Sequence, residues 1–212
     1  MPKLTNLGKP VSNKEADIVD VALGLFAGKG IDKTSMNDIA TAVGIRKASL
    51  YYYYSSKEAI VDAIIDSSRF KAVDVSNLLS DNTISLEDRL VKCGRTFLQG
   101  MKQRPQYQAM TRRESAIHET IGWRIKLRQQ MKQHIETRIA ALARILENDL
   151  QNLDRSTANI LASQFFHSLT YFFAFEYDTR MKPPGTRKIN RYVQVQVDSL
   201  MGYYNVKISG NN

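Results

Sequence analysis

The feature that most limits how this chain can fold is a glycine placed between two short amphipathic segments. Ser35, with Asp38 three residues later, has the spacing of a helix N-cap. The inward face of the helix that follows would consist of Met36, Ile39, Ala40 and Val43. Gly44 can adopt the left-handed conformation that ends such a helix, and a further helix over 46–54 must then start within two residues. This spacing, with the small Ala40 where the helices cross, predicts a helix-turn-helix.

Helical periodicity continues on both sides of this motif. Ser12 and Glu15 have capping-box spacing and precede a helix that Gly28 or Gly30 would end. Further helices are expected at 57–79, from Ser85 to Lys102 with Pro105 as the stop, and at 107–117, 123–150, 156–181 and 189–204. Residues 193–197 alternate like a strand, but a lone strand would have nothing to pair with. The sequence therefore predicts an all-α protein, a three-helix helix-turn-helix domain followed by a larger helical domain.

Composition excludes several classes of protein. The chain of 212 residues is 43% apolar, which is enough for a real core, and its longest apolar stretch, Leu169–Phe175, is too short to span a membrane. The first dozen residues lack the apolar middle of a secretory signal, so a cytoplasmic location is expected. The single Cys93 cannot form a disulfide within its chain. Its thiol would be either buried in packing or a redox sensor. The three histidines are far apart and no Cys and His cluster has metal-ligand spacing, so we expect no enzyme, metal or cofactor.

Four consecutive tyrosines end the second helix of the motif. At about 100° per residue their side chains point in four directions, which argues against one flat stacking surface. Tyr54 would turn inward with Leu50, Tyr52 and Tyr53 would face outward toward phosphate or sugar, and Tyr51 would lie at the edge. The alternative is that Tyr51 to Tyr53 merely cover the core.

The start of this helix carries the residues expected in a DNA major groove. Arg46 and Lys47 can donate to guanine O6 and N7, and the Ala48 methyl can meet a thymine methyl, with Ser49 beside them. The alternative is that the two basic residues are solvated or contact only phosphate. Net charge does not decide this point: the total is +9, but nine Lys and Arg against three acids lie between 102 and 138.

The stretch TSMNDIATAVGIRKASLYYYYSSKEAIV resembles the amino-terminal domain of the TetR family of transcriptional repressors. The resemblance rests on Thr34, Ser35, Ile39, Ala40, Gly44, Leu50, Tyr51, Ser55, Ser56 and Lys57. It departs from the family at Arg46, where a capping Ser is frequent, and at Tyr53, where His is usual. The expected DNA-binding residues are Thr34, Ser35, Arg46, Lys47, Ala48, Ser49, Tyr51, Tyr52, Tyr53 and Lys57, the last as a phosphate contact that the resemblance implies.

The resemblance also implies a division of labour along the chain. Residues 1–11 would be a flexible arm, 12–56 the DNA-binding domain, and 57–212 a ligand-binding and dimerisation domain. Candidates for the ligand site among the middle helices are Phe97, Met101, Met110, Trp123, Leu127 and His167. The alternative, which such residues more often represent, is plain core, and His167 would then be a core histidine with its hydrogen bonds satisfied. The nearby Arg112, Arg113, Arg124 and Arg128 favour an anionic end on a hydrophobic effector.

The last two helices are where the family forms its dimers. The second-to-last helix is apolar nearly all round, which indicates burial on more than one side. Expected dimer contacts are Phe165, Phe166, Leu169, Phe172, Phe173, Val193, Val197, Leu200 and Tyr204. The alternative is a helix central to a monomeric core.

Together these patterns predict a ligand-responsive repressor that binds a palindromic DNA operator as a homodimer and is released by a small hydrophobic effector. One alternative is a DNA-binding protein of the same fold that has no small-molecule ligand and is regulated by a partner protein. An enzyme on the same fold is disfavoured, because no nucleophile, base and orienting group stand at readable spacing.

Overall fold

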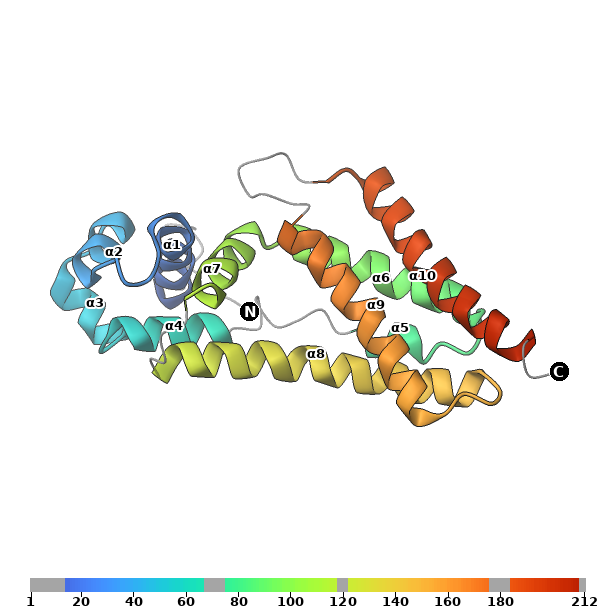
Figure 1. Ribbon diagram of the computed structural model, residues 1–212. Coiled ribbons are helices and arrows are strands. Elements are labelled where there is room, and N and C mark those ends of the chain that lie inside the picture. The colour runs from blue at the N-terminus through green and yellow to red at the C-terminus, as the bar shows by residue number, and fades with distance from the viewer. Residues whose placement is uncertain (1–13, 67–74, 118–121, 176–183, 210–212) are drawn as a thin grey trace. The chain divides into compact units, whose positions relative to one another are not determined.

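The computed structural model describes residues 14–66, 75–117, 122–175 and 184–209, and these form ten helices with no strand among them (Figure 1). The helices are α1 (Lys14–Lys29), α2 (Met36–Val43), α3 (Lys47–Tyr53), α4 (Lys57–Asp66), α5 (Ser76–Leu79), α6 (Leu86–Lys102), α7 (Pro105–Ser115), α8 (Gly122–Asp149), α9 (Arg155–Phe175) and α10 (Thr186–Ser209). The predicted all-α class is confirmed. No described helix is long and apolar enough to cross a membrane.

The chain divides into two compact units. The first is made of residues 1–71 with 106–127, and the second of 72–105 with 128–212. The first unit thus contains α1 to α4, α7 and the first turns of α8. The functional division predicted at residues 56 and 57 stays a prediction, but the packing groups α4, α7 and the start of α8 with the helix-turn-helix.

The core of the first unit is built on α1. Its buried face, Ile18, Val19, Ala22, Leu23 and Phe26, packs with Ile39 of α2, Leu50 of α3, and Ile60 and Ile64 of α4. Met110 of α7 and Trp123 and Leu127 of α8 complete the same cluster. Figure 1 shows α7 alongside α1. The three-helix domain therefore buries its apolar faces partly against residues from far along the chain.

The core of the second unit lies among α6, α9, α10 and the later part of α8. Gly94 of α6 allows a close approach, because a Cβ there would meet Val193 of α10 at 2.8 Å. Arg89, on the same helix, is buried and pairs with Asp149 at the end of α8. Cys93 is fully buried in this core, which raises the pKa of its thiol to about 12. Of the two alternatives for Cys93, the structure supports a buried packing thiol.

Most helix ends follow the predicted signals, with two differences, and the helix predicted over 193–197 is present. Pro105 does not stop α6; it is the first residue of α7, where a missing N–H costs nothing. Of the helix expected over 57–79, α4 covers 57–66 and α5 is a separate single turn after the non-helical Val75, while 67–74 lie outside the described residues. Residues 193–197 are helical despite their alternation, because Val193 and Val197 are both buried on one side of α10. Ser12 lies outside the described residues.

Candidate nucleic-acid interface

The turn between α2 and α3 is fixed by backbone geometry. Gly44 has φ of 74°, a left-handed conformation that a Cβ would strain, and its N–H donates to Thr41 O at 3.1 Å. Ile45 N donates to Ala40 O at 3.0 Å. Arg46 is extended and occupies the N-cap of α3 without a side-chain cap hydrogen bond. The predicted motif is therefore present, and the long side chain of Arg46 remains available for another contact.

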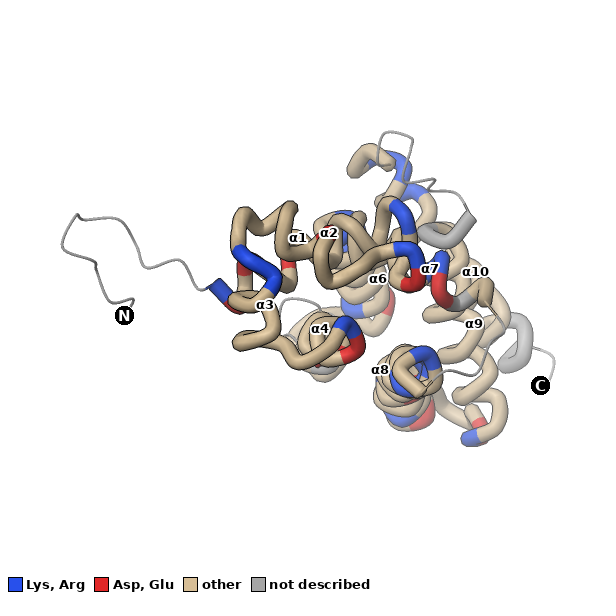
Figure 2. Tube along the Cα trace, turned by 90° about the vertical axis from the view of Figure 1, so that its left-hand side faces the viewer, with Lys and Arg blue, Asp and Glu red and all other residues tan. Residues whose placement is uncertain are grey.

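The start of α3 presents a continuous exposed row. Arg46, Lys47, Ala48 and Ser49 are all exposed, whereas Leu50 is fully buried and anchors the helix to the core. Lys47 Nζ lies 5.9 Å from the centroid of the Tyr51 ring. Figure 2 shows the basic residues together where α3 begins. This surface combines guanidinium, ammonium, methyl and hydroxyl groups on a short helix, which is the chemistry that major-groove recognition requires.

The tyrosines divide between the surface and the core. Tyr51 is 46% exposed, Tyr52 85% and Tyr53 37%, so all three present ring and hydroxyl to solvent. The rings of Tyr52 and Tyr53 meet edge to face at 5.3 Å. Tyr54 packs against the first core, as expected, but from an extended residue that caps α3 instead of from within the helix. Its burial, and then the nearby Glu15, raise the pKa of the Tyr54 hydroxyl.

The start of α2 is closed by a capping box. Ser35 Oγ accepts from Asp38 N at 3.1 Å, and Ser35 N donates to Asp38 Oδ2 at 2.8 Å. Lys29 Nζ lies 2.8 Å from the same carboxylate oxygen and is the main cause of the lowered pKa of Asp38. A phosphate at this end of α2 would therefore compete with Asp38 for the Ser35 amide.

Two of the predicted DNA contacts have structural partners inside the protein. Thr34 is buried and its Oγ1 donates to Gly30 O at 2.7 Å, which corrects its assignment as a surface contact. The side chain was misassigned because the family pattern marks the position but not the direction of the side chain. Lys57 Nζ donates to Ile31 O at 2.8 Å, so its ammonium is bonded to the turn before α2. The Lys57 side chain is half-buried.

The six predicted ligand residues do not gather at one site. Met110, Trp123 and Leu127 belong to the core of the first unit, and Phe97 and Met101 to the core of the second. His167 is exposed and is not a core histidine. Five of the six therefore lie in a core. Sequence could not separate them from pocket residues, because any interior apolar residue has the same helical spacing.

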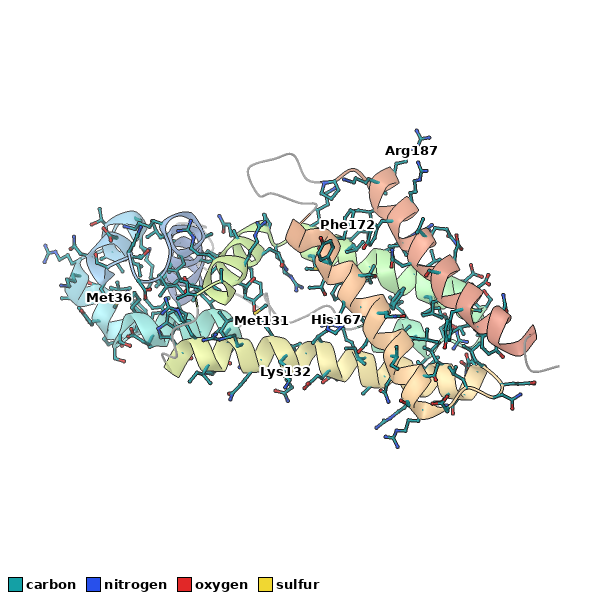
Figure 3. The ribbon with its side chains drawn as sticks, in the orientation of Figure 1. Met36, Met131, Lys132, His167, Phe172 and Arg187 are labelled. Carbon is teal, nitrogen blue, oxygen red and sulfur yellow. The ribbon has the colours of Figure 1, made fainter. Side chains whose placement is uncertain are left out.

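His167 lines a groove between α8 and α9 in the second unit. The groove has a volume of about 470 Å³ and is lined by Lys132, Ile135, Glu136, Ile139, Ala140, Asn159, Ser163 and His167. Its lining includes the apolar Ile135 and Ile139, and Lys132 and Glu136 among its lining residues form an ion pair at 3.6 Å. Lys132 and His167 are labelled on their helices in Figure 3. Sequence periodicity did not single out this groove, because its lining mixes charged, polar and apolar residues from two distant segments.

The predicted dimer contacts are mostly buried within the chain itself. Phe165, Phe166, Leu169, Phe172, Val193, Val197 and Leu200 are at most 5% exposed and pack in the core of the second unit. Tyr204 is half-buried and its hydroxyl donates to Gln151 O at 3.4 Å, and the side chain of Phe173 lies outside the described residues. The prediction is therefore corrected for the seven: their apolar surface is used in packing α9 and α10 against α6 and cannot also meet a second subunit.

A different set of residues faces outward on the same two helices. On α9, Ile160, Gln164, His167 and Tyr171 follow helical spacing and are all exposed. On α10 the exposed side carries Val195, Ser199, Gly202 and Tyr203. Ile160, Tyr171, Val195 and Tyr203 are each more than half exposed, so the outward sides of both helices carry large apolar side chains that the described part of the chain leaves mostly uncovered. The spacing of these residues was readable from sequence, but the stronger aromatic pattern of α9 masked it.

Comparisons with known proteins agree with this geometry. The family described as bacterial regulatory proteins, tetR family, matches residues 18–64. The transcriptional repressor KstR2 of Rhodococcus jostii strain RHA1 is 43% identical over 54 residues, which are 26% of each chain. The biofilm operon negative transcriptional regulator IcaR of Staphylococcus aureus strain Newman is 51% identical over 45 residues, 21% of this chain and 24% of that protein. The matched segments span about a quarter of the length of these curated relatives.

Similarity of fold extends beyond the matched segment. A solved TetR-like transcriptional regulator from Rhodococcus sp. RHA1 has a TM-score of 0.69 at 18% identity, covering 92% of this chain and 99% of that one. At this identity the likeness shows the fold alone. With the capped α2, the Gly44 turn and the exposed start of α3, these matches establish that the chain carries at residues 18–64 the DNA-binding domain of the TetR family of bacterial regulatory proteins.

Proposed function

We propose that this protein is a transcriptional repressor that binds a near-palindromic DNA operator as a homodimer and releases it when a small hydrophobic molecule binds the second unit. The observation that carries the proposal is the exposed row from Arg46 to Ser49, set on a turn that Gly44 and the Ser35 capping box hold in place. It lies in the segment that matches the TetR family, whose relatives KstR2 and IcaR are transcriptional regulators.

The DNA contacts can be tested with duplexes that the wild-type protein selects from a random pool. If Arg46 donates to a base, Arg46→Ala costs about 1–3 kcal/mol on the selected duplex and relaxes one position of the sequence. Arg187→Ala, on the exposed start of α10, removes the same charge elsewhere and serves as the control. Equal losses by Arg46→Ala on selected and random duplexes would show that Arg46 only clamps phosphate.

The homodimer is proposed to form through the outward sides of α9 and α10, not through the side chains first predicted. Ile160, Tyr171, Val195 and Tyr203 supply apolar area, and Ser199 and Gly202 are small enough for helices to approach closely. A two-fold dimer of this kind pairs the same patch on both subunits. Its operator would have two half-sites spaced by about one helical turn, ~34 to 36 Å, or a multiple of it.

The effector is proposed to bind in the second unit, near the α8 and α9 groove with His167 or deeper toward Phe97 and Met101. The expected preference for an anionic effector loses part of its basis. Arg113 donates to Gly28 O at 2.9 Å and Arg124 is buried with Glu114 and Asp32, so both guanidinium groups are engaged in the first unit. A hydrophobic ligand remains the proposal, and its charge is to be determined by experiment.

The effector site can be tested by filling the groove. Ala140 lines it and is exposed, so Ala140→Trp should occupy its volume without disturbing the core. A screen of hydrophobic acids and hydrophobic amines for release of the selected duplex identifies active compounds. Ala140→Trp should then weaken release at unchanged DNA affinity. If Ala140→Trp responds to the active compounds as the wild type does, the groove is excluded as the effector site and Phe97→Ala is the next variant to test. If no compound releases the wild-type protein from the duplex, regulation by a partner protein is favoured.

A further inference from the structure

A buried arginine joins α7 and α8 to the turn that precedes α2. Arg124, on the first turn of α8, is only 1% exposed and is among the largest fully buried side chains of the described residues. Its Nε donates to Glu114 Oε2 at 3.1 Å, its Nη2 donates to Asp32 Oδ2, and its guanidinium lies 4.6 Å from the Trp123 ring. Arg124, Glu114 and Asp32 are called the Arg124 cluster below.

The cluster contacts the backbone of this turn as well as the Asp32 side chain. The second oxygen of Glu114 accepts the Ile31 N–H at 3.3 Å. Beside it, Arg113 Nη2 donates to Gly28 O at 2.9 Å. Within the turn, Gly30 adopts φ of 91° and Thr34 N donates to Ile31 O at 3.1 Å, so the backbone is bonded from Ile31 to the residue before Ser35. Movement of the cluster would therefore be passed to Ser35, the N-cap of α2, three residues after Asp32.

The three members of the cluster differ in what their loss would do. Arg124 and Glu114 are both buried, so removing Arg124 leaves the Glu114 carboxylate in the core without its counter-charge, and removing Glu114 leaves Arg124 with only the half-exposed Asp32. Asp32 has a side chain that is 54% exposed, so its charge can be lost while Arg124 and Glu114 still neutralise each other. Burial opposes the charged form of Arg124, but the hydrogen bonds that the guanidinium donates to Asp32 and Glu114 outweigh it and raise the pKa of the guanidinium. Asp32 is thus the member through which the turn can be released without unfolding.

The same helix that carries Arg124 also enters the second unit. Residues 122–127 of α8 belong to the first unit and 128–149 to the second, in one helix of 28 residues. We propose that Arg124 is a positioning residue for DNA recognition: it fixes the turn before α2, and loss of its contact with Asp32 releases that turn and lowers selectivity for the operator. This inference rests on the proposed function.

The test compares Asp32→Asn with Glu58→Gln in the full chain. Glu58 is exposed on α4, so its replacement removes the same charge from the same unit without touching Arg124. Affinity is measured for a duplex selected by the wild-type protein and for a scrambled duplex of equal length. Glu58→Gln should change both affinities by one factor, because charge acts on any phosphate backbone. Asp32→Asn should lower the ratio of the two affinities, by between about two- and thirty-fold.

Two further measurements separate positioning from a general loss of structure. Asp32→Glu keeps the carboxylate and should restore most of the ratio. Hydrogen exchange should become faster at residues 31–35 in Asp32→Asn while α4 exchanges as in the wild type. An unchanged affinity ratio in Asp32→Asn, or an equal fall in Glu58→Gln, would overturn the inference. If the wild-type protein selects no duplex, the proposed function is refuted, and unchanged exchange at 31–35 would then refute the cluster's role independently.

Discussion

At the scale of single residues, the charged groups around α2 have partners within the protein before any DNA arrives. Lys57 was expected to contact phosphate on the strength of a family pattern, yet its ammonium donates to Ile31 O. Asp38 is an acid on a surface proposed to meet a polyanion, and Lys29 neutralises it at 2.8 Å. The free protein thus holds its recognition surface in one arrangement, which lowers the ordering cost when DNA binds.

The Asp38 capping box should make the stability of the protein depend on pH in a defined direction. The hydrogen bond from Lys29, followed by those from Ser35, holds the pKa of Asp38 below its ordinary 3.8. A lowered folded-state pKa gives stability that is fully present above the unfolded value and is lost as pH falls through the folded one. Asp38→Asn should therefore be less stable than the wild type at neutral pH, and the difference should shrink progressively as pH falls below the ordinary pKa of 3.8. Urea midpoints of both proteins from pH 7 to pH 2 measure this; a difference independent of pH would contradict it.

At the scale of helices, sequence periodicity located most elements because each has one side in a core. The Ser35 and Ser85 caps and the Gly44 stop are local chemistry, and they were predicted correctly. An error arose at Pro105, which was expected to end one helix and instead begins the next. The α9 residues show the limit most clearly. A helix apolar nearly all round can be buried by its own chain or by another, and only the packing on α6 and α10 reveals which.

The crossing of α6 and α10 should be sensitive to a single methyl group. A Cβ on Gly94 would lie 2.8 Å from Val193 Cγ1 and 3.4 Å from Phe165 Cζ, both on buried side chains with little room to move. Gly94→Ala improves helix propensity by up to about 1 kcal/mol, but overpacking of a core costs typically ~1 to 3 kcal/mol. We expect net destabilisation, measured by urea unfolding. Gly28→Ala, which has open space around its Cβ, should be neutral or stabilising, and an equal gain in both variants would show that α6 and α10 adapt freely.

At the scale of the whole molecule, the grouping of helices into two units was beyond sequence reasoning. The contact between Arg124 and Asp32 joins residues 92 positions apart, and Lys126 similarly bonds Asp62 across 64. No periodicity encodes which distant helix will supply such a partner. The family resemblance covered the segment that carries the candidate DNA contacts and implied the rest of the architecture. Most of those candidates are exposed, whereas most of the predicted ligand and dimer residues lie in the two cores.

The assignment of the dimer surface leads to opposite expectations for two neighbouring valines of α10. Val193 is fully buried, so Val193→Ala should lower the unfolding free energy by about 0.5–2.5 kcal/mol and leave the dimer dissociation constant unchanged. Val195 is 54% exposed, so Val195→Glu should leave the folded subunit intact but place two like charges in the interface. We expect that variant to weaken dimerisation by about 2 kcal/mol or more, as a central interface residue does.

Sedimentation velocity over nanomolar to micromolar protein distinguishes these outcomes, with Gln99→Glu on the exposed side of α6 as the control for added charge. Tyr203→Glu should behave as Val195→Glu does, because both side chains stand on the outward side of the same helix. Loss of the dimer should also weaken binding to a two-half-site duplex far more than to a single half-site, since the second contact is then no longer intramolecular. Dimers that persist in both glutamate variants would place the interface elsewhere, and a wild-type monomer that keeps full operator affinity would exclude a dimeric mechanism.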